Sequence, residues 1–564
     1  MPRIDIILYR SCADVPLEQP FDACIVGSGA GGGAVAYALT KAGFKVAVLE
    51  KGPHYKDEDF FHDELSVCRR SFFVPNPADE PHVVVRDGGA KPERTTDGWI
   101  ACCVGGGTVH MSGYFFRLRA EDFRLRSLYG NVKGANVADW PVSLTDMEAF
   151  YDEVERVIGV SGDAGREGRP NPYPLAPIIS HPAGELVDEA CRKLGWRSFP
   201  TPRAILSADY GGRPACHYCG FCGSYGCEVG AKSSSLSTFL AIAQATGKLR
   251  IFSRAMVETI DVDAAGRAIG ATYIDASGAR HQIRAAVTIV ACSAIETARL
   301  LLMSTHGRYP KGLGNSSGMV GKNLMFSSFA SAYARFDLPS RHFEESARVM
   351  PFLDRAVLDH YLVPKAGLPH PKAGSLLFML PHKNPILQAE RVAKITDGPS
   401  VFGAELKRRM REVFLDTRSI EVEAFGESLP HAGCAVTLDP ETKDRFGLPV
   451  ARIQLALHPA SLAASDFLAA RARDILGACS PRSIGSYPSS RLYTVLQAGT
   501  ARMSKRPDDG VVDPSGKVHD VSSLYVADAS GFPSSGGAPF TLTIMANALR
   551  VGSHIVARAS RGEL

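Results

Sequence analysis

One segment near the amino terminus constrains the fold more than any other part of the sequence: FDACIVGSGAGGGAVAYALTKAGFKVAVLE, Phe21–Glu50. Its apolar run ending at Val26 predicts a buried strand, and the Ala-rich stretch after the glycines predicts a helix. The turn between them carries the G-x-G-x-x-G spacing with Gly27, Gly29 and Gly32. A strand, a glycine turn and a helix in this order are typical of a Rossmann-type dinucleotide-binding unit.

Each part of this turn has a physical purpose in binding a pyrophosphate. The first glycine permits the tight turn, the second lets the backbone approach the phosphates, and the third allows the helix to pack closely on the strand. The helix N-terminus offers unpaired N–H groups to phosphate oxygens. Glu50 ends the second expected strand, where a carboxylate accepts hydrogen bonds from an adenosine ribose. The segment therefore predicts a bound dinucleotide without a 2′-phosphate.

Length and composition limit the classes of protein. The chain has 564 residues, more than the roughly 250 to 300 at which one hydrophobic core stops growing, so we expect two interleaved domains. Its net charge of +4 is too small to indicate nucleic acid or an anionic membrane as a partner. The start MPRIDIILYRSC has a short apolar core broken by Asp5, and no run of about 18 apolar residues occurs. We expect a cytoplasmic protein with no signal peptide and no transmembrane segment.

Six blocks along the chain resemble, in order and spacing, those of the glucose, methanol and choline oxidoreductases, a family of flavoproteins. Besides the first segment they include WIACCVGGGTVHMSGYFFR, AVTIVACSAIETARLLL, NSSGMVGKNLMF, VTLDPETKDRFGLPVARI, and the pair QAGTARM and VADASGFPSSGGAPFTLTIMANALRVGSHI. The similarity runs from about residue 21 to about residue 555 and is closest to the bacterial alcohol and sugar dehydrogenase branch.

This resemblance implies an α/β fold in which a Rossmann-type FAD-binding domain is interleaved with an α+β substrate domain built on an antiparallel sheet. The expected FAD-binding domain is discontinuous, over residues 18–145, 210–325 and 497–564, and the expected substrate domain covers 146–209 and 326–496. Two patterns support this organisation. Residues 144–157 have helical periodicity after the start signals Pro141 and Ser143, and residues 251–290 alternate apolar and polar residues as a β-meander does.

The resemblance also implies FAD as the cofactor and specifies the residues that bind it. The expected cofactor-binding residues are Gly27, Ser28, Gly29, Ala30, Gly32, Glu50, Gly106, Gly107, His110, Val257, Asp528, Ala529 and Thr541. His110 closes GGGTVH, where several members of the family carry a histidine bonded to the 8-methyl carbon of the flavin. Two alternatives stay open for it: a covalent link of this kind, or a histidine that packs beside a non-covalent flavin.

A run of cysteines forms a second candidate site. CHYCGFCGSYGC places Cys216, Cys219, Cys222 and Cys227 at C-x2-C-x2-C-x4-C, and thirteen cysteines without a signal peptide favour thiols over disulfides. Thiolates at this spacing can converge on an iron–sulfur cluster or on Zn²⁺. Some similar flavin dehydrogenases hold a cluster at the matching place and others hold none. An iron–sulfur cluster, zinc and metal-free thiols therefore all stay open.

The sequence departs from its relatives where the family places its catalytic residues. These enzymes oxidise an alcohol while hydride goes to flavin N5, and a histidine in H-x-x-G-T, with a later His or Asn, handles the hydroxyl proton. The matching segments here read LQAGT and GGAPFTLT, so Leu496 and Pro539 occupy the two positions. Neither side chain can accept or donate a proton. The local candidates to replace them are Gln497 and Arg502, followed by Tyr493 and His519.

The resemblance implies an FAD-dependent enzyme that acts on the CH–OH group of a small alcohol or sugar-like substrate, as a dehydrogenase or an oxidase. The unusual catalytic pair keeps two alternatives open: a flavoprotein of other chemistry, such as a lyase or a photodecarboxylase, and a degenerate flavin-binding protein. The sequence leaves the electron acceptor open among oxygen, a quinone and a cytochrome. A metal cluster at the cysteines would favour a dehydrogenase, because it offers a one-electron exit.

Overall fold

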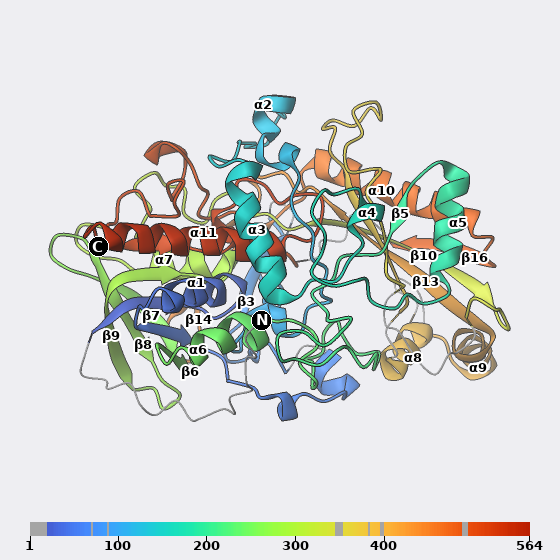
Figure 1. The fold of residues 1–564 in the computed structure, drawn as a ribbon, viewed down its shortest axis with the longest axis horizontal. Coiled ribbons are helices and arrows are strands. Elements are labelled where there is room, and N and C mark those ends of the chain that lie inside the picture. Colours follow the sequence, from blue (N-terminus) through green and yellow to red (C-terminus); the bar gives the residue numbers. More distant parts are fainter. Residues whose placement is uncertain are drawn as a thin grey trace.

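A computed structural model describes residues 20–68, 72–86, 89–343, 353–381, 384–394, 400–487 and 494–564. The described residues form two main halves, which lie side by side in Figure 1. One half is built on a mostly parallel sheet and the other on an antiparallel sheet. This arrangement confirms the predicted α/β fold with its Rossmann-type unit. The predicted domain boundaries stay a prediction.

The first sheet has seven strands, in the order β6-β2-β1-β9-β8-β7, with β17 paired to β9. Their bounds are β1 Phe21–Val26, β2 Val46–Glu50, β6 Leu249–Ser253, β7 Met256–Val262, β8 Ala268–Ile274, β9 Arg280–Val290 and β17 Leu524–Val526. The strands β6, β2, β1, the end of β9 and β17 run parallel. The start of β9 pairs antiparallel with β8, and β8 with β7, so the predicted meander extends the parallel sheet.

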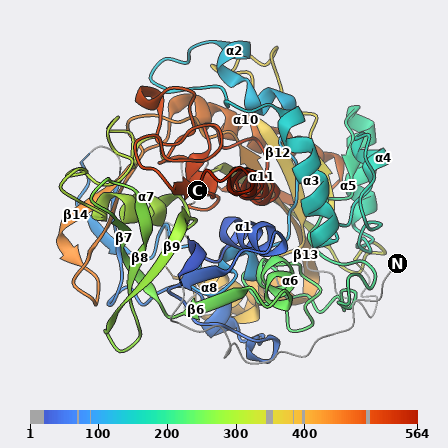
Figure 2. The same ribbon diagram turned by 60° about the vertical axis from the view of Figure 1, so that its left-hand side comes forward.

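Five of the described helices lie against this sheet or against one another beside it. They are α1 Ala30–Lys41, α3 Leu144–Ile158, α6 Ala241–Ala245, α7 Ala294–Met303 and α11 Thr541–Ser560. α11 runs beside α1, as both Figure 1 and the turned view in Figure 2 show. Gly552 permits this approach, because a Cβ there would lie 2.8 Å from the Cβ of Ala38. The predicted helix after Ser143 is confirmed as α3, and a capping box between Ser143 and Asp146 starts it.

The second sheet has six strands, in the order β16-β10-β13-β12-β11-β5. Their bounds are β5 Ser198–Phe199, β10 Ser328–Asp337, β11 Arg355–Val357, β12 Gly374–Met379, β13 Thr417–Gly426 and β16 Ser483–Tyr487. One face is apolar, because alternate residues of β10 and β13 pack in a core with α5 (Gly184–Leu194) and α10 (Pro459–Ala478). The opposite face turns toward the parallel sheet and carries polar side chains.

A third, smaller sheet and several short helices complete the described fold. A four-stranded sheet joins β14 (Ala435–Lys443), β15 (Pro449–Leu455), β3 (His82–Arg86) and β4 (Glu93–Thr95). The short helices are α2 Leu125–Tyr129, α4 Ala164–Glu167, α8 Pro385–Ala393 and α9 Gly403–Arg411. Of the helices described, none is long and apolar enough to cross a membrane.

Candidate active site between the two sheets

A cavity of about 1720 Å³ extends from the parallel sheet to the polar face of the antiparallel sheet. Every expected cofactor-binding residue except Gly32 lines it. Gly32 lies outside the cavity lining and packs against the glycine turn, where a Cβ would lie 1.9 Å from the carbonyl oxygen of Gly27. The close packing of helix α1 on the glycine turn therefore depends on this glycine, as the fingerprint predicts.

Two glycine turns meet backbone to backbone at the dinucleotide end of the cavity. A Cβ on Gly106 would lie 2.8 Å from the Cα of Gly29. Ser28 joins the two turns, because its Oγ donates to Glu50 Oε2 at 2.7 Å and accepts from the N–H of Gly105 at 3.0 Å. A side chain at position 106 would therefore clash with the main chain of Gly29, so this approach of the two turns requires glycine at 106.

Two buried carboxylates lie at this end of the cavity. Glu50 also accepts from the N–H of Gly52 at 3.0 Å, and burial raises its pKa. Asp528 accepts from the N–H groups of Ser293 and Ser530 at 3.0 and 2.8 Å, and burial raises its pKa as well. A carboxylate has about four lone-pair positions, so each keeps acceptor capacity toward ligand hydroxyl groups.

His110 lies where the resemblance places it, on the cavity wall. Its Nε2 lies 2.8 Å from the carbonyl oxygen of Ile100, and its ring stacks on Phe73 with the centroids 4.7 Å apart. A carbonyl oxygen only accepts, so Nε2 carries the hydrogen and donates it. Both the covalent and the non-covalent alternative for His110 stay predictions.

The two positions that the family fills with catalytic residues are apolar. Leu496 and Pro539 both line the cavity. Leu496 has a left-handed backbone with φ +56° and packs against an apolar cluster that includes Phe329 and Phe425. Gln497 also lines the cavity, and its Nε2 donates to the carbonyl oxygen of Gly98. Its Oε1 is buried and has no hydrogen-bond partner among the described residues.

The other candidates for proton transfer lie elsewhere. Arg502 is not among the residues that line the cavity, and its guanidinium donates to the carbonyl oxygens of Asp509 and Asn136. His519 also lies outside the cavity lining, with Nε2 3.1 Å from Ser504 Oγ. Tyr493 lies outside the described residues. The structure therefore does not bring Arg502 together with the cofactor-binding residues, because hydrogen bonds to loop carbonyls hold it away.

A buried ionic triad, Lys372, Asp122 and Glu427, supports the segment that carries Pro539. Lys372 Nζ contacts both carboxylates, and all three side chains are almost fully buried. Glu427 Oε1 accepts from the N–H of Ser535 at 3.0 Å. This segment is therefore held by residues of both halves of the molecule.

Sequence reasoning missed two acidic residues and a tyrosine on the cavity wall. Glu421 and Glu423 line the cavity on β13, and Tyr114 lines it from the loop after His110. The Tyr114 hydroxyl donates to Glu423 Oε2 at 3.0 Å. Burial raises the pKa of Glu421, and it raises that of Glu423 to about 7. The signal in the sequence was the alternation in SIEVEAF, which places acids at every second position of a strand.

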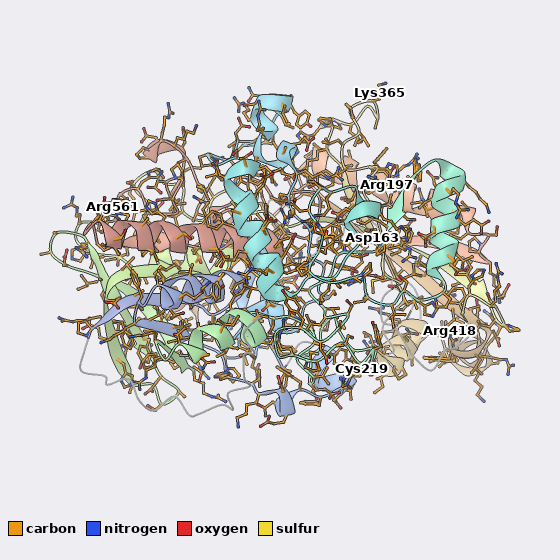
Figure 3. The ribbon with its side chains drawn as sticks, viewed as in Figure 1. Asp163, Arg197, Cys219, Lys365, Arg418 and Arg561 are labelled. Carbon is orange, nitrogen blue, oxygen red and sulfur yellow. The ribbon has the colours of Figure 1, made fainter. Side chains whose placement is uncertain are left out.

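The cysteine run does not form the site that the spacing suggested. Among the described residues, no group of three or more His, Cys, Asp or Glu side chains could hold a metal ion. Burial raises the pKa of Cys216 to about 11 and that of Cys222 to about 12. Cys219 is exposed and is labelled in Figure 3. The structure supports neither the iron–sulfur nor the zinc alternative.

Comparison with known proteins agrees with this geometry. Sequence models described as GMC oxidoreductase match residues 82–327 and 430–548, and a model of the NAD(P)-binding Rossmann-like domain matches residues 25–55. The chain belongs to the GMC oxidoreductase family. It is an FAD-dependent oxidoreductase, and the residues at the dinucleotide end of the cavity fit this cofactor: Gly29 and Gly106 have no side chain to cover the main chain there, and the Glu50 carboxylate can accept hydrogen bonds.

Several relatives span almost the whole of this GMC oxidoreductase. It is 30% identical to 6'''-hydroxyparomomycin C oxidase of Streptomyces lividus, over 96% of this chain and 93% of that protein. It is 31% identical to 2-methyl-1,2-propanediol dehydrogenase of Mycolicibacterium austroafricanum, over 96% of each chain. Paromamine 6'-oxidase of Streptomyces fradiae is 31% identical, over 94% of this chain and 91% of that one.

Solved structures show the same fold at lower identity. A formate oxidase from Aspergillus oryzae superposes with a TM-score of 0.61 at 16% identity, over 96% of this chain and 99% of that chain. An FAD-dependent oxidoreductase from Chaetomium thermophilum gives a TM-score of 0.61 at 17% identity, over 96% of this chain and all of the other.

Proposed function

We propose that this GMC oxidoreductase oxidises the CH–OH group of a small alcohol or sugar-like substrate to a carbonyl group. The observation that carries the proposal is the continuous cavity, which joins the dinucleotide end to the polar face of the antiparallel sheet. Relatives named for the oxidation of paromamine and 2-methyl-1,2-propanediol support the same chemistry.

FAD, when bound, supplies the acceptor for the two electrons that leave the substrate carbon. The protein supplies the rest. Backbone N–H groups at the glycine turns and the carboxylate of Glu50 bind the cofactor, with Gly32 keeping helix α1 close behind them. Leu496, Phe329 and Phe425 exclude water from the apolar part of the cavity, and the polar side chains of β10 and β13 beyond them can bind substrate hydroxyl groups.

The proposal is tested by anaerobic reduction of the FAD-loaded protein with paromamine, 2-methyl-1,2-propanediol and 1-propanol. We expect at least one of these to bleach the flavin absorbance and to yield the matching carbonyl product by mass spectrometry. Deuterium at the reacting carbon should slow the bleaching, which separates C–H cleavage from slow binding.

Reoxidation then identifies the electron acceptor, with oxygen, a quinone and a cytochrome supplied in turn. The proposal fails if no alcohol reduces the flavin while blue light or another class of substrate gives turnover. That result would favour a flavoprotein of different chemistry. A colourless protein that does not take up FAD would contradict the cofactor assignment itself.

A further inference from the structure

The cavity face of the antiparallel sheet is built from two strands that present alternate side chains to the same space. On β13 these are Ser419, Glu421, Glu423 and Phe425, and on β10 they are Phe329, Ser331, Tyr333 and Arg335. The register pairs Glu423 with Ser331 and Phe425 with Phe329. Residues that face the same side of a strand repeat at about 6.7 Å. Glu423 is therefore the first ionisable residue on β13 beyond Phe425, which belongs to the apolar cluster that Leu496 packs against.

Tyr114 links this acid to the cofactor side of the cavity. It follows His110, Met111, Ser112 and Gly113, which all line the cavity. Its ring lies 6.0 Å from that of Phe425, and its hydroxyl donates to Glu423 Oε2 at 3.0 Å. The Tyr114 hydroxyl thus holds the Glu423 carboxyl group on the cavity wall.

The surroundings of Glu423 bring its titration near neutrality. Burial and the neighbouring Glu421 raise its pKa, whereas Tyr114 and Arg203 lower it, and the resulting value is about 7. Arg203 is itself paired with Asp354 at 3.2 Å, which offsets part of its charge. A proton acceptor works best when its pKa lies near the working pH.

The strands on either side of Glu423 add no charge opposite it. The facing residues are Ser331 on β10 and Leu377 on β12. The next pairs along the strand bring Tyr333 and Met379 opposite Glu421, and Arg335 faces Ser419 at the far end. The charged neighbours that decide the protonation of Glu423 are therefore Glu421 and Arg203.

We infer that Glu423 accepts the proton of the substrate hydroxyl group, in place of the histidine that Leu496 replaces. This inference rests on the proposed alcohol oxidation. The substrate O–H bond breaks and its proton forms a bond to the Glu423 carboxylate. The C–H bond breaks and its hydrogen passes to the flavin oxidant with both bonding electrons, so that the C–O bond becomes a C=O bond. Tyr114 is a positioning residue that keeps the carboxylate oriented through its hydroxyl group.

The test compares Glu423→Gln with Glu421→Gln, an acid on the same strand face two residues away. For the wild type, the anaerobic rate of flavin reduction by the best alcohol of the panel should rise with pH through about 7, because the carboxylate is the active form. Glu423→Gln should lose about 10² to 10⁴ in this rate and become independent of pH over that range. Glu421→Gln should keep the rise with pH but move it to lower pH, because the charge of Glu421 raises the pKa of Glu423.

Tyr114→Phe gives a readout that loss of packing alone would not produce. Without its hydroxyl, the carboxylate of Glu423 loses a stabilising donor, so the rise in rate should move to higher pH. Infrared difference spectra of the FAD-loaded protein without substrate provide a second readout. The wild-type spectra should contain a protonated carboxyl band that titrates near pH 7 and is lost in Glu423→Gln, while the bands of the other buried carboxyl groups remain.

Bound FAD and the thermal unfolding temperature, measured for each variant, show that the fold is intact. The inference is overturned if folded Glu423→Gln reduces its flavin at the wild-type rate, or if it keeps the dependence on pH. If no alcohol reduces the flavin of the wild type, the proposed function is contradicted, and the role of Glu423 is contradicted with it. These two failures are distinct, because the second is seen before any variant is made.

Discussion

A histidine at position 496 should change the rate of flavin reduction little when Glu423 is present, and raise it strongly when Glu423 is replaced. Leu496→His replaces a half-buried leucine, whose full burial is worth roughly 1.5 to 3 kcal/mol, so the loss of packing costs about 1 kcal/mol. The backbone adds no new strain, since His tolerates the left-handed region at φ +56° better than most residues. General-base assistance of about 10² to 10⁴ corresponds to roughly 3 to 5 kcal/mol in the barrier. The catalytic effect should therefore dominate wherever no other base acts.

With Glu423 present, Leu496→His should change the rate of flavin reduction less than about tenfold, because a base already takes the proton. In Glu423→Gln, the same change should recover about 10² or more. Anaerobic stopped-flow measurements with one alcohol give the rate of flavin reduction for the wild type, the two single variants Leu496→His and Glu423→Gln, and the double variant. Leu496→Asn is the control for the backbone conformation, because asparagine supplies no base. An equal gain in both backgrounds would show that the two sites act independently and would refute the reasoning.

Three further substitutions test the buried ionic triad, the glycine turn at Gly106 and a link between His110 and FAD. Lys372→Met leaves the two carboxylates of the buried triad unpaired and should cost about 3 to 5 kcal/mol, seen as a lower unfolding temperature and earlier FAD release. Lys365→Met, at an exposed loop tip (Figure 3), should change neither. Gly106→Ala should abolish FAD binding, whereas Gly130→Ala, also at positive φ but in open space, should retain it. If FAD is covalently linked, acid-precipitated protein should be yellow, and His110→Ala should release the colour; a colourless wild-type pellet would leave the non-covalent alternative.

Local patterns predicted the dinucleotide end of the site well. The strand Phe21–Val26, the helix Ala30–Lys41 and the strand Val46–Glu50 follow one another within thirty residues, so periodicity and turn glycines determine them directly. The approach of Gly106 to the same turn depends on a segment far along the chain, and only the family resemblance suggested it. Physical pattern and resemblance together therefore predicted which residues line this end of the cavity.

The proton-handling end could not be predicted in the same way. The alternation in β13 fixes that Glu421 and Glu423 share a face, but not whether that face meets solvent or a cavity. That choice depends on α10 covering the opposite face, and on Tyr114 reaching Glu423 from a loop some three hundred residues earlier in the chain. Arg502 is a different case: its place beside the G-T motif suggested a catalytic role, whereas its guanidinium donates to loop carbonyl oxygens and does not line the cavity.

A proton acceptor on the antiparallel sheet changes how specificity and catalysis are related in this enzyme. Where a histidine at position 496 handles the proton, the acceptor lies outside the strands of the antiparallel sheet. Here the acceptor lies on the same strand face as Glu421 and directly opposite Ser331, both of which line the substrate end of the cavity. Substitutions that reshape this face for a new substrate would also change the charge near Glu423 and hence its pKa. Substrate range and the pH dependence of flavin reduction should therefore change together.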